Sequence, residues 1–173
     1  MPYDVNLINH LKGLLDAAAD FNLSKVFLHA FTDGRDCDPH SGKYFVNDIQ
    51  EYMAQSTGEL ASITGRYYAM DRDKRWERIK LAYDALVHGI GKNTTNAVQS
   101  ILESYQKGIT DEFVKPIILT DEKGNPKATI QKDDVIMFFN FRTDRGRQLT
   151  EVLSQNDQVE FDMKTLPLYF CQI

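Results

Sequence analysis

Cysteine and long apolar runs are scarce in this sequence of 173 residues, and each scarcity excludes a class of protein. The two cysteines, Cys37 and Cys171, lie far apart and belong to no partner motif. They make neither a disulfide framework nor a zinc site, so a reducing cytosol is the expected compartment. No apolar run reaches the roughly 18 residues of a membrane span, and the first residues lack a signal-peptide pattern. The sequence therefore predicts a cytoplasmic protein without a membrane partner.

Positive charge is also in deficit, which bears on possible partners. The chain has 20 Lys and Arg against 25 Asp and Glu, a net charge of −5. Nucleic-acid-binding proteins usually present a basic surface, so no nucleic-acid partner is expected. With 42% hydrophobic and 11% aromatic residues, the chain can bury a sizeable core and is not disordered. It shows no internal repeat or linker-like segment, so residues 1–173 are predicted to form a single domain.

Apolar residues alternate between helical and strand-like spacing along the chain. The predicted helices cover 6–22, 45–53, 76–87, 98–105 and 143–153. The predicted strands cover 24–31, 60–68, 116–120, 134–140 and 166–171. Gly89 and Gly91 end the third helix, and Thr94 or Thr95 is expected to cap the fourth. Alternating strands and helices predict an α/β layer fold with a mixed or mostly parallel sheet.

The eight arginines, unlike the scattered lysines, fall in three short stretches. They are Arg35; Arg66, Arg72, Arg75 and Arg78; and Arg142, Arg145 and Arg147. Several of them follow a predicted strand and precede a helix, where α/β proteins bind ligands and helix N-termini favour phosphate. Because a guanidinium matches phosphate or carboxylate oxygens two at a time, this pattern indicates a site for a small phosphorylated ligand. The alternative is pairing with acids on exposed helices, which is favoured for Arg75 and Arg78.

Acidic residues flank each of these arginines, and two interpretations remain open. The acids Asp33, Asp36, Asp71, Asp73 and Asp144 either form ion pairs or orient the guanidiniums around a ligand. In the second interpretation Asp36 is the candidate for proton transfer. His29, in an apolar strand, is interpreted as a packed histidine rather than a ligand. No His/Asp set has metal-ligand spacing, so no metal site is predicted.

Four segments together resemble a known family. They are Thr32–Asp36, Gly65–Trp76, Phe139–Arg145 and Phe161–Pro167. In sequence and order they are similar to the cofactor-independent (2,3-bisphosphoglycerate-independent) phosphoglycerate mutases. The resemblance covers nearly the whole chain but only about a third of the family's length. It matches the inserted substrate-binding, or phosphotransferase, domain and implies a three-layer α/β/α fold.

The resemblance also implies a reaction and its participants. Members of the family interconvert 3-phosphoglycerate and 2-phosphoglycerate through a phosphoserine formed in a separate phosphatase-like domain, which holds two Mn²⁺ ions. That domain would be the partner of this chain, which carries none of the metal ligands. The residues implied to bind substrate are Arg35, Asp36, Arg66, Arg72, Arg142 and Arg145. Asp36 is also implied to assist proton transfer.

One departure from the family pattern concerns a histidine. The family carries a Gly-Gly-Val-His-Ser-His-like segment, with a catalytic histidine, just before the helix that here contains His10. This chain has Val5, Asn6 and Leu7 there. The expectation is an excised or truncated domain that lacks mutase turnover alone. Two other functions stay open: a non-catalytic binding module for another phosphorylated ligand, and a domain that only folds and docks onto its partner.

Overall fold

The computed structural model describes residues 3–140 and 143–172. The helices are α1 (Tyr3–Asp20), α2 (Gly42–Gln55), α3 (Arg66–Ala69), α4 (Trp76–Tyr83), α5 (Ala97–Gln106) and α6 (Thr143–Ser154). The strands are β1 (Phe27–Thr32), β2 (Glu59–Gly65), β3 (Lys92–Thr94), β4 (Ile117–Leu119), β5 (Val135–Phe138) and β6 (Tyr169–Gln172). A π-helical turn η1 (Asp84–His88) and two 3₁₀ turns, η2 (Asp111–Phe113) and η3 (Val159–Phe161), complete the order.

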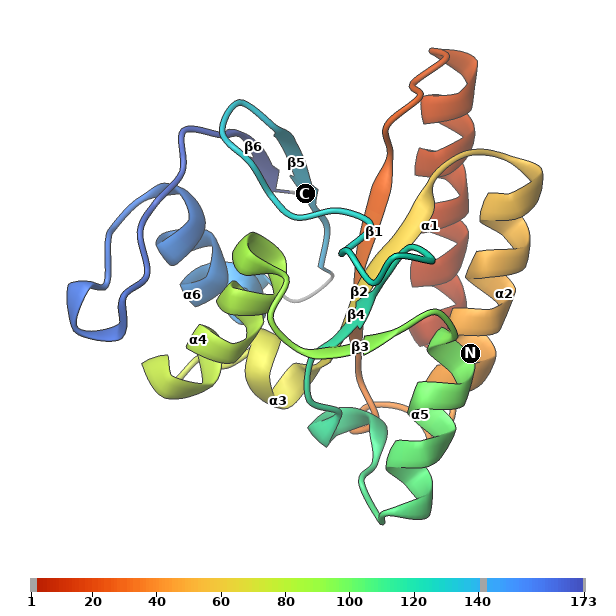
Figure 1. Ribbon diagram of the computed structural model, residues 1–173, viewed down its shortest axis with the longest axis horizontal. Helices are drawn as coiled ribbons and strands as arrows, with labels where there is room; N and C mark the ends of the chain where they lie inside the picture. The colour runs from red at the N-terminus through yellow and green to blue at the C-terminus, as the bar shows by residue number, and fades with distance from the viewer. Residues whose placement is uncertain (1–2, 141–142, 173) are drawn as a thin grey trace.

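Helices cover both faces of the central sheet, as the α/β prediction requires. Figure 1 shows α1, α2 and α5 on one face and α3, α4 and α6 on the other. The sheet order is β1-β2-β4-β3, with β1 parallel to β2, β3 parallel to β4, and β2 antiparallel to β4. The prediction of an α/β fold with a mixed or mostly parallel sheet is confirmed. None of the described helices is both long enough and apolar enough to cross a bilayer.

The segment 134–140 forms a strand, but it lies outside the central sheet. Its strand, β5, pairs in parallel with β6 in a separate two-stranded sheet. Apolar spacing identifies an extended segment but carries no information about which strand it pairs with. The sequence therefore located the strand correctly without revealing the second sheet.

The core packs tightly on both faces of the central sheet. On one face Leu60 and Ile63 of β2 pack with Val46 of α2 and Ile101 of α5. On the other face the helices α4 and α6 bury Ile79 among their apolar residues. Each such side chain contributes roughly 1.5–3 kcal/mol when fully buried. Burial of β2 from both sides explains why its apolar run is nearly continuous.

The structure corrects two predicted element boundaries and adds one strand that the sequence pattern did not predict. The strand predicted over 60–68 ends at Gly65, and Arg66 begins α3 instead of continuing the strand. The cap of α5 is Asn96 rather than Thr94 or Thr95, because the Asn96 side chain accepts the Gln99 N–H. The strand β3 was not predicted, since it is short and largely exposed and polar.

Candidate functional site

The ends of β1 and β2 are held against the turn η2 by close backbone contacts. Thr32 Oγ1 donates a hydrogen bond of 2.8 Å to the Asp111 carbonyl. A Cβ atom at Gly34 would lie 2.7 Å from Asp111 Cβ, and one at Gly65 would collide with the carbonyl oxygen of Glu112. Glycine is therefore required at both positions for the backbones to approach. This contact fixes where the two strands deliver the residues that follow them.

Asp111 itself joins η2 to the start of α2. Its buried carboxylate accepts the Gly42 N–H at 2.7 Å and the hydroxyl of Tyr105. It thereby caps α2, a role that the side chain of Ser41 does not fill. Burial raises the pKa of Asp111, although both hydrogen bonds act in the opposite direction.

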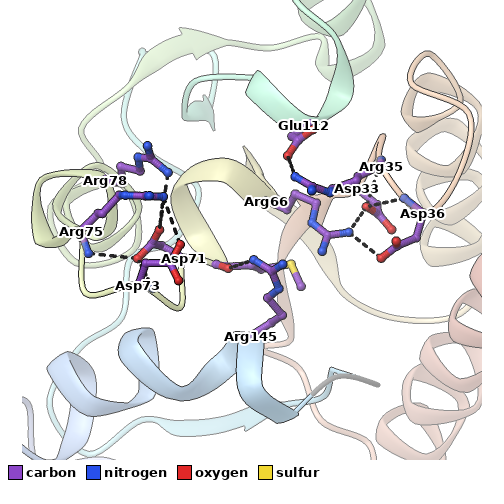
Figure 2. A network of polar contacts seen from close by, with 11 residues as sticks. Asp33, Arg35, Asp36, Arg66, Asp71, Asp73, Arg75, Arg78, Glu112 and Arg145 are labelled. Carbon is purple, nitrogen blue, oxygen red and sulfur yellow. Dashed lines mark hydrogen bonds and ion pairs between the residues drawn. The ribbon is translucent and has the colours of Figure 1, made fainter.

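Arg66 is a deeply buried charged group of the site. Its side chain is 3% exposed, and its Nη1 binds carboxylate oxygens of Asp33 and, at 2.8 Å, of Asp36 (Figure 2). Burial opposes its charge, but the bonds to Asp36 and Asp33 outweigh burial and raise the pKa of Arg66. Its other terminal nitrogen, Nη2, is buried and has no hydrogen-bond partner among residues 3–140 and 143–172. The guanidinium is thus fixed on one side and available for an acceptor on the other.

Asp33 links the loop after β1 to Arg66. Its Oδ1 accepts the backbone N–H groups of Arg35 and Asp36 at 3.2 and 3.3 Å, in addition to the Arg66 guanidinium. Arg35 extends into solvent, with 63% of its side chain exposed, and donates to Glu112 at 3.3 Å. The structure therefore brings Arg35, Asp36 and Arg66 together around one carboxylate. The sequence pattern indicated Asp33 only as one of several acidic neighbours of the arginines.

Three further arginines were predicted to bind the ligand. Two of them lie near the end of α3, and the third is outside the residues that the structure describes. Arg145 Nη1 donates to the carbonyl of Met70, just past α3, at 3.2 Å (Figure 2). Arg72 forms an exposed ion pair of 2.8 Å with Asp144. Arg142 lies outside the residues that the structure describes. Arg66 is thus the first residue of the one-turn helix α3, and Arg145 contacts the residue that follows its last.

Arg75 and Arg78 serve the structure of the adjacent loop, as the pairing interpretation expected. Their Nη1 atoms lie 3.7 and 3.5 Å from Asp71, whose side chain is only 3% exposed. Arg78 also stacks over Tyr67, with its Cζ 3.8 Å from the ring centroid. The Asp71 carboxylate in turn accepts the backbone N–H groups of Asp73 and Arg75. Asp71 is therefore a structural centre of the loop that connects α3 to α4.

A cleft of about 1010 Å³ opens beside Arg66 and its two carboxylate partners. Asp33, Asp36, Arg66 and Asp111 line it at the carboxyl end of β1, and apolar residues of β1 and β5 line much of its length. The polar end therefore carries one guanidinium, that of Arg66, among three carboxyl groups. No three His, Cys, Asp or Glu side chains in the described part of the chain are arranged to hold a metal ion. This part therefore has no ligand set for the two Mn²⁺ ions that the resemblance implies.

His29 also faces the cleft and is packed in the sheet, in agreement with its interpretation as a packed histidine. Its Nδ1 lies 2.7 Å from Oγ of the buried Ser62. Burial lowers the pKa of His29 from its usual 6.5 to about 4. The folded protein therefore holds His29 neutral over a pH range in which the unfolded chain protonates it.

This difference predicts acid sensitivity. Between pH 6.5 and 4 the unfolded chain binds the extra proton, so the free energy of unfolding should fall as pH falls, by up to about 3 kcal/mol from this group. Urea unfolding at pH 7 and pH 5 measures the effect. His29→Asn, which cannot titrate, should remove this share of the pH dependence. An identical pH dependence in the variant would contradict the assignment.

The sequence of this chain matches a known protein family and several named proteins. Residues 6–173 match the family described as "BPG-independent PGAM N-terminus". The 2,3-bisphosphoglycerate-independent phosphoglycerate mutase of Flavobacterium psychrophilum is 62% identical over 162 residues, covering 94% of this chain and 32% of that protein. The Bacteroides fragilis protein of the same name is 52% identical over 166 residues, covering 95% and 32%. The chain thus spans about a third of the length of the curated relatives that it matches.

A solved structure agrees with the sequence matches. The Leishmania mexicana phosphoglycerate mutase, determined at low cobalt concentration, superposes with a TM-score of 0.88 at 25% sequence identity. The match covers 95% of this chain and 32% of that one. Sequence and fold therefore point to the same group of proteins.

Proposed function

Because this chain belongs to the family of BPG-independent PGAM N-terminal domains, we propose that it is the substrate-binding part of a phosphoglycerate mutase. The proposed reaction is the interconversion of 3-phosphoglycerate and 2-phosphoglycerate in glycolysis. The phosphoryl-accepting serine and the metal ions, proposed to be two Mn²⁺, belong to the remaining polypeptide of the longer enzymes. The proposed work of this chain is to hold and orient the glycerate and its phosphate.

The observation that carries this proposal is the half-satisfied guanidinium of Arg66. A phosphoglycerate carries about three negative charges near neutral pH, because the second phosphate pKa is near 6. Asp33 and Asp36 fix Nη1 of Arg66, while the buried Nη2 lacks an acceptor among the described residues. A ligand oxygen would supply that acceptor in a charge-assisted bond at little cost in side-chain entropy.

The other residues receive roles according to their positions. Arg35 is exposed enough to leave Glu112 and close over a bound anion. Arg72 and Arg145 are proposed to hold the ligand from the other end of α3, together with Arg142. Asp36, a half-exposed carboxylate bonded to Arg66, is proposed to take up and return the hydroxyl proton as the glycerate reorients. Held by several arginines, the glycerate would remain bound between the two transfers.

Titration with 3-phosphoglycerate tests the proposal on the chain itself. We expect binding in roughly the millimolar range, since a solvated site weakens charge-assisted bonds. D-Glycerate and inorganic phosphate, each with part of the charge, should bind more weakly. Calorimetry and amide chemical shifts provide the measurement. A folded chain that shows neither heat nor shifts at tens of millimolar ligand would contradict the proposal.

Arg35 and Arg147 form a matched pair for a first mutational test. Both side chains are exposed, so alanine at either position should leave stability nearly unchanged. Arg35→Ala should weaken 3-phosphoglycerate binding about five- to tenfold through loss of one charge-assisted bond. Arg147→Ala changes the net charge equally but should have less than about a twofold effect, because Arg147 is not among the residues proposed to hold the ligand and salt screens its exposed charge. Equal losses in both variants would show that binding depends on net charge alone.

A further inference from the structure

The β1–α2 loop, residues 33–41, carries two of the residues proposed to bind the phosphoglycerate, Arg35 and Asp36. The loop contains no helix or strand of its own. Asp33 and Asp38 each accept backbone N–H groups of the residues that follow them, which orders one short turn at each end. Such local bonds do not fix the path of the loop as a whole. That path depends on contacts with the rest of the protein.

One residue of the turn η2, Asp111, holds this loop at both ends. At its start, Thr32 Oγ1 donates to the Asp111 carbonyl at 2.8 Å. Near its end, the Asp111 N–H donates to the carbonyl of Pro39 at 2.9 Å, and the Asp111 carboxylate accepts the Gly42 N–H at 2.7 Å. The N–H, the carbonyl and the side chain of Asp111 are therefore all bonded to the loop or to the residues that flank it.

The packing around Asp111 leaves the loop little room to shift. A Cβ atom at Gly34 would lie 2.7 Å from Asp111 Cβ, and one at Gly42 would lie 2.6 Å from its Oδ1. Asp111 is buried, and the hydroxyl of Tyr105 in α5 donates to its carboxylate. The loop backbone is thus held by buried, closely packed groups, whereas the Arg35 side chain that it carries is exposed.

The cap of α2 comes from Asp111 although a local residue could supply it. Ser41 directly precedes α2, and serine is one of the usual capping residues. Its hydroxyl instead donates to the Asp38 carbonyl at 2.7 Å, and the cap comes from 69 residues away. A buried carboxylate is costly, and capping alone would not require one. The long-range cap has a further consequence, since it ties the end of the loop to the residue that also holds its start.

The same turn contacts the end of β2, so it sets the loop against Arg66. The Gly65 N–H donates to the carbonyl of Val114, just past η2, at 2.8 Å, and a Cβ at Gly65 would collide with the Glu112 carbonyl. Glu112 Oε1 also lies 3.3 Å from Nη1 of Arg35 (Figure 2). The turn η2 therefore determines how the loop that bears Arg35 is placed relative to Arg66.

We propose that Asp111 is a positioning residue of the binding site. Through its bonds at both ends of the β1–α2 loop, it holds the backbone of Arg35 and Asp36 in one conformation before the ligand binds. A displacement of about 1 Å in a binding group can cost a hundredfold in rate, so such support matters even without contact with the ligand. The inference rests on the proposed function for the identity of the ligand, but the effect on the loop does not depend on it.

Backbone NMR relaxation of the ligand-free chain and calorimetric titration with 3-phosphoglycerate test the inference together. In Asp111→Ala the order parameters of residues 33–41 should fall from about 0.85 towards 0.6. Affinity should fall about five- to tenfold with them. Asp111→Asn keeps an oxygen for the Gly42 N–H and an amide group that can donate to the Tyr105 hydroxyl. It should therefore retain an ordered loop and bind within about threefold of the parent.

Thr32→Val decides the question if Asp111→Ala does not fold. Valine suits a strand but cannot donate to the Asp111 carbonyl. Thr120→Val is the matched control, because Thr120 is 5% exposed against 6% for Thr32 and also donates to a carbonyl, that of Thr94. It lies at the opposite end of the sheet, since β4 runs antiparallel to β2. Thr32→Val should lower the order parameters of the loop and weaken binding about threefold, and Thr120→Val should change neither.

The two measurements separate this inference from the proposed function. A parent chain that binds no 3-phosphoglycerate would overturn the proposed function, while the relaxation data would still decide whether Asp111 holds the loop. A lower urea midpoint in Asp111→Ala with loop order unchanged would show that Asp111 only stabilises the fold, and would overturn the inference. Equal loop order in Thr32→Val, Thr120→Val and the parent would overturn it as well.

Discussion

Arg66→Lys is expected to weaken 3-phosphoglycerate binding by roughly 30-fold, about 2 kcal/mol, in a protein that still folds. Lysine keeps the positive charge beside Asp33 and Asp36, so the carboxylates are not left without a cation. It cannot hold both carboxylates and still present a planar donor to the ligand. The loss of affinity should therefore come from the loss of the Nη2 donor of Arg66, which lacks an acceptor among the described residues. Calorimetric titration of both proteins measures it.

Arg147→Lys is the matched control for this substitution. Arg147 is exposed on α6, so the same chemical change there should leave affinity within about twofold. Thermal unfolding of Arg66→Lys identifies the temperature range in which the variant is folded, and binding is compared only within that range. An Arg66→Lys protein that is folded and binds as tightly as the parent would remove Arg66 from the site.

Gly65→Ala is expected to lower the free energy of unfolding by roughly 2–4 kcal/mol. Gly65 has φ −65° and ψ 145°, an ordinary extended conformation, so alanine brings no backbone strain. Its Cβ would instead collide with the carbonyl oxygen of Glu112, a backbone atom that cannot rotate away. Relief of this collision separates β2 from η2 and displaces Arg66, the next residue. Binding of 3-phosphoglycerate should therefore decrease together with stability.

Alanine substitutions at two other glycines are controls for Gly65→Ala. They separate the effect of the collision from the general effect of replacing glycine. Gly13 lies in α1 with nothing within 4 Å of an added Cβ, so Gly13→Ala should stabilise the protein by about 0.5–1 kcal/mol. Gly108 has φ +73° and equally open space, so Gly108→Ala should show the cost of backbone conformation alone, about 1 kcal/mol. A urea midpoint for Gly65→Ala equal to that of the parent would contradict the close-contact account of the site.

Sequence patterns predicted the parts of this fold that depend on local spacing. The helices, the strands rich in apolar residues and the turn at Gly89, which has φ +65°, follow from periodicity and glycine geometry. The clustering of arginines likewise pointed to Arg35, Arg66 and their acidic neighbours, which the structure brings together. Local spacing could not show which arginine is buried, because burial of Arg66 depends on the packing of β1, β2 and η2.

Long-range partners are the features that the sequence could not reveal. Asp111 caps α2 from 69 residues away, and its position within a short turn gives no sign of that role. The pairing of β5 with β6, rather than with the central sheet, likewise depends on tertiary packing. The short polar strand β3 owes its conformation to β4, since two of its three residues, Lys92 and Asn93, have little strand preference.

The most direct test of the account is nitrogen-detected NMR of the arginine side chains during a 3-phosphoglycerate titration. We expect the Arg66 guanidinium signals to shift until the protein is saturated, and its Nη protons to exchange more slowly with water, because a ligand oxygen accepts a hydrogen bond from Nη2. Arg147 should be unaffected. Arg66 signals that stay unchanged while the ligand is demonstrably bound, or that shift no more than those of Arg147, would contradict the claim that this guanidinium holds the substrate.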